Sequence, residues 1–232
     1  MITFIVNADD FGYSRAVNYG ILDAYLFGAV NSATVMMNMP GTDHAMKIAH
    51  DHPDLRVGVH FNLTCGPSVI KEHKTIIDEN GDFLKPSQLS AKKDIDLNEI
   101  EREWRAQLEL FYAYGLKPSH IDSHHHVHTF PETKDTVMKL AREFNLKVRT
   151  FAGIDESLAL SDTFTADFSG TGASFETLNA IAANAKDGET VEIMTHPAYL
   201  DTAIMNGSSY TEGRLQELDV LMNWPVPNDV TL

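Results

Sequence analysis

Histidines are concentrated in one short segment of the chain. Five of the 11 histidines lie in the run His120-Ile121-Asp122-Ser123-His124-His125-His126-Val127-His128. Neutral imidazole is the commonest protein metal ligand and the usual proton donor or acceptor near neutral pH. If the run is a strand, alternation places on one face His120, Asp122, His124, His126 and His128. Such a face suits a metal site in which some histidines bind the ion and others support them, so the run predicts a metal-dependent enzyme.

Paired carboxylates end the first strand-like segment of the chain. Asp9 and Asp10 lie in the sequence Asn7-Ala8-Asp9-Asp10-Phe11-Gly12. Neighbouring strand residues point in different directions, so one carboxylate can bind a metal ion while the other stays free as a base. A turn or a helix cap explains the same pair when it is considered alone.

Two isolated histidines occur at equivalent strand ends. His60 shares a strand face with Gly58 and Asn62, and His196 follows an apolar segment that Pro197 terminates. Considered alone, each could equally be a structural, surface or functional histidine. The motifs at the other strand ends strengthen the functional interpretation of both. The remaining histidines have no such context, and we expect them on the surface: His44, His50, His52 and His73.

Strand-like and helix-like segments alternate along the chain. The expected strands are 2–6, 32–37, 56–62, 118–123, 146–150 and 190–195. The expected helices are 15–27, 43–50, 98–114, 132–144, 175–185 and 212–222. This order predicts an α/β fold with a mostly parallel sheet covered by helices. Because no dinucleotide-binding fingerprint is present, a barrel is favoured over a doubly wound sheet.

We expect one domain over residues 1–232, because no low-complexity linker divides the chain. Its longest stretch without a helix, residues 66–96, contains the turn signal Asn80-Gly81 and is interpreted as a small β-flap. The flap follows a strand whose end would face a barrel active site, so it is a candidate substrate contact, as is Arg149.

Composition excludes several classes of protein. The net charge of −15 argues against a nucleic-acid partner. Cys65 is the only cysteine, which rules out an internal disulfide or a cysteine-based zinc site and suits a reducing compartment. No apolar run approaches the roughly 18 residues of a membrane helix, and the expected location is cytoplasmic.

The four motifs together resemble the YdjC-like carbohydrate deacetylases, a family that includes the bacterial chitooligosaccharide deacetylases. The motifs occur in the family's order and the resemblance covers nearly the whole chain. It implies a distorted or incomplete (β/α) barrel, related to glycoside hydrolase and deacetylase barrels, with one divalent metal ion. Carried over motif by motif, the resemblance implies that Asp10, His60 and His124 are the metal ligands. It implies that Asp9 is the catalytic base and that His196 is a candidate proton donor. Asp122 and His126 are expected to support the ligands.

The implied reaction is hydrolysis of the N-acetyl group of a 2-acetamido sugar, such as a short chitooligosaccharide, with release of acetate. The ligand types suit Zn²⁺, the family also implies Mg²⁺, and the sequence leaves both open. The expected partners are a small N-acetylated sugar and a second copy of the chain in a homodimer, without nucleic acid or membrane.

Two other functions stay open at this point. The His-x-His repeats within residues 124–128 are typical of amidohydrolases and metal-dependent phosphoesterases, which usually carry that pair on the first barrel strand. An inactive metal-binding or sugar-binding protein would keep His60 and His124 but would not need Asp9.

Overall fold

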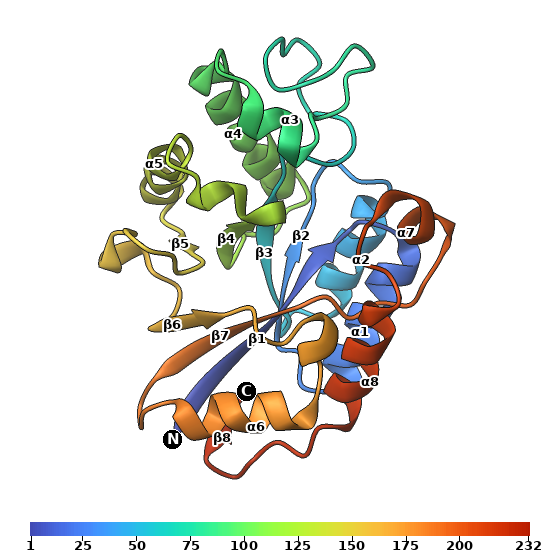
Figure 1. Cartoon of the computed structure of the whole chain (residues 1–232), viewed down its shortest axis with the longest axis vertical. Helices are drawn as coiled ribbons and strands as arrows, with labels where there is room; N and C mark the ends of the chain where they lie inside the picture. Colours follow the sequence, from blue (N-terminus) through green and yellow to red (C-terminus); the bar gives the residue numbers. More distant parts are fainter.

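A curved sheet of parallel strands forms the centre of the computed structural model, which describes all 232 residues (Figure 1). The strand order is β5-β4-β3-β2-β1-β7-β6, and β8 pairs with the start of β1. The strands are β1 (Ile2–Phe11), β2 (Ser32–Val35), β3 (Arg56–Phe61), β4 (His120–Ser123), β5 (Lys147–Val148), β6 (Thr163–Thr165), β7 (Thr190–Thr195) and β8 (Val230–Thr231). All six strands expected from the sequence are present, whereas the short β6 and β8 were not anticipated.

Helices cover the outside of the sheet (Figure 1). They are α1 (Arg15–Phe27), α2 (Thr42–Asp51), α3 (Pro86–Ala91), α4 (Leu97–Ala113), α5 (Lys134–Phe144), α6 (Phe175–Asn184), α7 (Thr202–Gly207) and α8 (Gly213–Asn223). Side chains cap several of them: Ser14 accepts from the backbone N–H of Val17, and Asp96 accepts from that of Asn98. No helix is both long enough and apolar enough to span a membrane.

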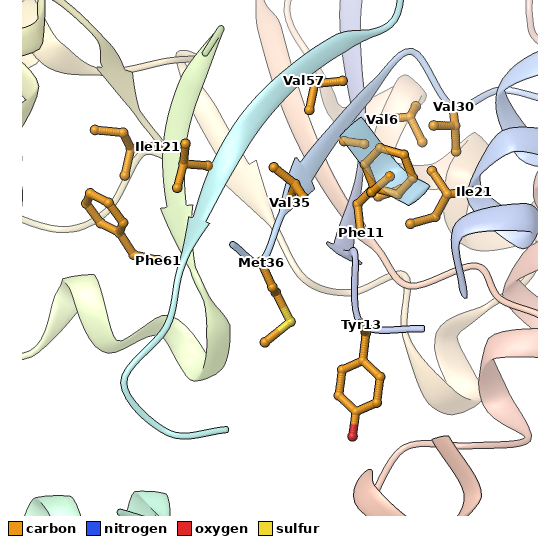
Figure 2. Packing of buried hydrophobic residues seen from close by; sticks show 14 of the residues in the cluster. Val6, Phe11, Tyr13, Ile21, Val30, Val35, Met36, Val57, Phe61 and Ile121 are labelled. Atoms are coloured by element: carbon orange, nitrogen blue, oxygen red, sulfur yellow. The ribbon is translucent and has the colours of Figure 1, made fainter. Parts of the chain in front are cut away.

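The hydrophobic core lies between the sheet and the helices (Figure 2). Buried apolar residues such as Val6, Val35 and Val57 alternate along the strands with polar ones. Phe61 stacks on Trp104 of α4, with ring centroids 4.8 Å apart. Because strand side chains alternate between faces, the same register turns the polar residues toward the inside of the curved sheet.

The sheet is an incomplete barrel. Its edge strands β5 and β6 do not pair directly; instead the segment before β6 contacts β5 through a parallel bridge between Val148 and Ala159. The amide of Leu160 donates to the carbonyl of Val148 at 2.9 Å. This seam of few hydrogen bonds confirms the distorted or incomplete barrel that the sequence predicted.

The long segment after β3 is fixed by two glutamates of α4, Glu99 and Glu103. Glu103 accepts hydrogen bonds from the backbone N–H groups of Val69 and Ile70, at 2.9 and 3.0 Å, and from His73. Antiparallel bridges within this segment include the pair Ile77 and Phe83. His73 is buried against Glu103, so its expected surface position was wrong: the flap folds over it and supplies a carboxylate partner.

Candidate metal centre

Three side chains converge at the carboxyl ends of neighbouring strands. Asp10 Oδ1 lies 2.9 Å from Nδ1 of His124 and 3.4 Å from Nε2 of His60. All three ligand atoms are within 4.8 Å of one another. Nitrogen and oxygen ligands about 2.0–2.2 Å from Zn²⁺ in a tetrahedron are separated by roughly 3.4 Å. Asp10 Oδ1 is buried and has no hydrogen-bond partner, which a cation would supply. The donor set therefore fits a divalent ion.

Local backbone geometry places these ligands. Asp10 has a positive φ of 65°, where the register between β1 and β2 shifts after Ala8. This irregularity separates the directions of the two adjacent aspartates. His60 comes from β3 and pairs in register with Asp122 of β4. The backbone outlier at Asp10 is the kind of strain that clusters at functional sites.

The histidine run does not continue as a strand. The chain leaves the sheet at Ser123 and forms a 3₁₀ turn over His124–Thr129, in which His125 and His126 have φ values of 53° and 52°. The prediction that five side chains share one strand face was therefore wrong. His120 and Asp122 point into the barrel, whereas the residues from His124 to His126 line the cavity above it.

Asp122 orients one of the candidate ligands. Its Oδ1 lies 2.7 Å from Nδ1 of His60, so a proton on Nδ1 leaves Nε2 facing Asp10. Burial lowers the pKa of His60, but the nearby carboxylates of Asp122 and Asp10 outweigh it and raise the pKa to about 10. A proton and a cation therefore compete for this imidazole. The structure does not bring His126 to the ligands: its ring lies against Phe164, with centroids 5.8 Å apart.

Asp9 is held by a buried arginine. Arg149 donates to its two carboxylate oxygens at 2.6 and 2.7 Å. The same guanidinium contacts Glu192 at 2.7 Å and Asp122 at 2.9 Å. Burial opposes the charge of Asp9, yet Arg149 overcomes it and lowers the pKa, so Asp9 is ionised at neutral pH. Arg149 is 1% exposed and is not among the residues that line the cavity, so it supports the site from inside the barrel, and its contact with substrate stays a prediction.

His196 directly follows β7, lines the same cavity and is held by α8. Its backbone N–H donates to Glu217, and its Nδ1 lies 3.7 Å from the same carboxylate. Tyr210 also donates to Glu217, at 2.7 Å. Burial lowers the pKa of His196, but the charge of Glu217 more than offsets it, so the pKa is raised above that of a free histidine. His196 is thus suited to carry a proton near neutral pH.

Arg214 is the second buried arginine of the site. It extends from α8 and donates to Asp10 Oδ2 at 2.6 Å. Sequence analysis identified neither arginine as part of this framework, nor Glu217. The helix that carries Arg214 and Glu217 was expected at 212–222, but charged residues on a helix are by themselves typical of a solvated surface.

These groups surround one cavity of about 520 Å³. Asp9, Asp10, His60, His124 and His196 all line it. The flap contributes Lys85 and Pro86, and the segment before α8 contributes Gly207 to Tyr210. The structure therefore brings together every residue that the sequence assigned to metal binding or proton transfer.

Comparisons with known proteins identify the family to which this chain belongs. The chain matches the YdjC-like protein family over residues 3–230 and belongs to that family, as the resemblance predicted. A carbohydrate deacetylase from Geobacillus stearothermophilus is 46% identical over 218 residues, covering 94% of this chain and 88% of that protein.

Solved structures support the same assignment of fold. A candidate cellobiose-phosphate cleavage protein from Enterococcus faecalis V583 is 32% identical, with a TM-score of 0.88 over 95% of this chain and 90% of that chain. A peptidoglycan N-acetylglucosamine deacetylase is 13% identical, with a TM-score of 0.50 over 95% of this chain and 79% of the other. The latter likeness concerns the fold alone.

Proposed function

We propose that this protein is a metal-dependent carbohydrate N-deacetylase, which hydrolyses the N-acetyl group of a 2-acetamido sugar such as a short chitooligosaccharide. The observation that carries the proposal is the position of Asp9 and His196 beside the Asp10, His60 and His124 cluster in one cavity. The 46% identity to a carbohydrate deacetylase supports the substrate class.

Asp10, His60 and His124 are the residues that would hold the metal ion. A bound divalent ion acidifies water and polarises a carbonyl oxygen, which is the chemistry that amide hydrolysis requires. Two imidazoles and one carboxylate are a ligand set found in catalytic zinc sites, and Zn²⁺ is our first choice over Mg²⁺ on this ground.

Asp9 and His196 divide the proton transfers between them. Asp9 is ionised and fixed by Arg149, so it can accept the proton of the attacking water. His196, whose pKa is raised by Glu217, can donate a proton to the departing nitrogen. One water is consumed: its oxygen forms the new bond to the acetyl carbon, the carbon–nitrogen bond breaks, and acetate and a free amine result.

The shape of the site agrees with a small sugar as substrate. Cavities of roughly 300–1,000 Å³ commonly bind small molecules, and this one has a volume of about 520 Å³. Most of its lining residues are polar, with hydroxyl, imidazole and charged groups from the strand ends, the flap and the segment before α8. Such groups can hydrogen-bond the hydroxyls of a sugar ring.

The decisive experiment measures acetate release from N,N′-diacetylchitobiose. The full chain is stripped with a chelator, reloaded with Zn²⁺, Mg²⁺, Mn²⁺ or Co²⁺, and compared with the stripped protein. We expect acetate only from reloaded samples. A phosphomonoester assay tests the phosphoesterase alternative in parallel. Sugar binding without acetate release under any ion would overturn the proposal in favour of a binding protein.

A further inference from the structure

Arg214 lines the cavity beside the candidate metal centre and is held by Asp10 and Tyr210. Its side chain is 97% buried, since the side-chain exposure is 3%. One terminal nitrogen donates to Asp10 Oδ2 at 2.6 Å, and Nε donates to the carbonyl of Tyr210 at 2.8 Å. The guanidinium carbon also lies 5.6 Å from the centre of the Tyr210 ring. Arg214 therefore has little freedom to move away from Asp10.

The two oxygens of Asp10 consequently have different surroundings. Oδ1 faces the ring nitrogens of His60 and His124 and has no hydrogen-bond partner. Oδ2 is occupied by Arg214. An aspartate in a metal site can bind with one oxygen or with both. Here only Oδ1 is free of a hydrogen bond.

The geometry points to Arg214 as a positioning residue that makes Asp10 a one-oxygen ligand and thereby keeps coordination positions open for water and substrate. This inference rests on the proposed function. An open position is what separates a catalytic metal site from a closed structural one. Because the positive charge of Arg214 repels a cation, its contribution is to coordination geometry and not to the affinity for the ion.

Helix α8 also positions the proposed proton donor, His196. Glu217 lies three residues after Arg214 on the same helix and holds His196. The distance between the metal ligand Asp10 and the proton donor is therefore set partly by one helix. A change at Arg214 should accordingly reduce kcat more than it raises KM, since it alters the geometry of the reaction while the other residues that line the cavity stay in place.

Cobalt(II) provides a readout that does not depend on activity. Its visible d–d bands weaken as the coordination number rises, so they report whether Asp10 binds through one oxygen or two. We expect Arg214→Met to keep Co²⁺ bound, with weaker bands than the wild type and a kcat about 10–100-fold lower. Arg214→Lys, which retains a charged donor, should recover bands like those of the wild type.

Arg105→Met is the matched control, because Arg105 forms a surface ion pair with Glu143 on the outside of α4. It should change neither the spectrum nor kcat. If Arg214→Met does not fold, Arg214→Gln replaces it, since glutamine is polar but too short to reach Asp10. An unchanged spectrum in the folded variant, or loss of Co²⁺ binding, overturns the inference.

Failure of this inference can be distinguished from failure of the proposed function. A wild-type protein that binds Co²⁺ but releases no acetate contradicts the deacetylase assignment, and the spectra of the Arg214 variants still decide how Asp10 binds. Conversely, acetate release by the wild type together with identical spectra in both proteins removes only the role of Arg214.

Discussion

Arg149 donates to both carboxylate oxygens of Asp9, at 2.6 and 2.7 Å, from inside the barrel. The pairing keeps Asp9 ionised and fixes its plane while the carboxylate still borders the cavity. Asn7 donates to the same carboxylate at 2.9 Å. Both oxygens of Asp9 are hydrogen-bonded, whereas Oδ1 of Asp10 faces the candidate ligands His60 and His124. The two aspartates can therefore be tested separately.

Asp9→Asn should abolish most of the catalysis and leave metal binding intact. Asparagine cannot accept the proton of the attacking water, so we expect kcat for acetate release to fall by about 10²–10⁴-fold. Bound Zn²⁺, measured by elemental analysis, should stay at the wild-type level. The exposed Asp54→Asn variant serves as the control. Unchanged turnover in Asp9→Asn would remove Asp9 as the base.

Glu217→Gln should shift the pH dependence of the reaction. The charge of Glu217 raises the pKa of His196 against the opposing effect of burial. A histidine donates only below its pKa, and the substitution lowers that pKa. The alkaline limb of kcat/KM should therefore move to lower pH, with a greater loss at pH 8 than at pH 6. A parallel loss at every pH, or the same shift in the exposed control Glu212→Gln, would argue against His196 as the donor.

Glu192→Gln should change how stability depends on pH. Burial raises the pKa of Glu192 from 4.5 to about 7, against the lowering effect of Arg149. Between these values the folded protein keeps a proton that the unfolded chain releases, so stability falls as pH rises. The loss is roughly 3 kcal/mol between pH 4.5 and 7. Glutamine cannot ionise, so the variant lacks this loss.

Urea denaturation at pH 5 and pH 8 measures the effect. The free energy of unfolding of Glu192→Gln, measured relative to wild type, should be higher at pH 8 than at pH 5. For the exposed Glu109→Gln variant, the difference from wild type should be the same at both pH values. An equal difference at the two pH values would show that Glu192 is already ionised at pH 5 in the folded protein.

Glu103→Gln should loosen the flap. The carboxylate accepts from the backbone of Val69 and Ile70 and from His73, and glutamine offers only one acceptor oxygen. A buried donor without a partner costs about 1–3 kcal/mol. We expect faster hydrogen exchange at Val69 and Ile70 and a higher KM, because the flap carries Lys85 at the cavity wall. Exchange as slow as in Glu109→Gln would contradict this role.

The sequence predicted the main strands because most carry several apolar residues and are followed by a helix. β6 and β8 were missed because they have 3 and 2 residues, too few for a periodic signal, and neither follows a helix as closely as the equally short β5 follows α5. The turn at His124 was missed for a different reason. A strand and a 3₁₀ turn with two left-handed histidines give no distinct pattern of residue types, and only the surrounding fold enforces the turn.

The candidate ligands and proton-transfer residues could be found because each lies at a strand end beside its motif. Their partners could not. Arg149 is 140 residues from Asp9, and Arg214 is 204 residues from Asp10. Nothing in a periodic pattern indicates which buried charges pair, since that depends on how strands from distant parts of the chain meet. Spacing therefore located the reactive groups, and only the structure shows what orients them.

Few backbone hydrogen bonds join the β5 and β6 edges of the sheet at the barrel seam, so Arg149 also helps to hold the sheet together there. Its guanidinium lies 5.0 Å from the ring centre of Phe164 on β6, and it forms ion pairs with β1, β4 and β7. Arg149 directly follows β5, so its contact with Phe164 links the two edge strands that a closed barrel would join by backbone pairing. The orientation of Asp9 and the closure of the sheet therefore share one side chain, and we expect a substitution at Arg149 to affect both the proposed catalysis and the stability of the molecule.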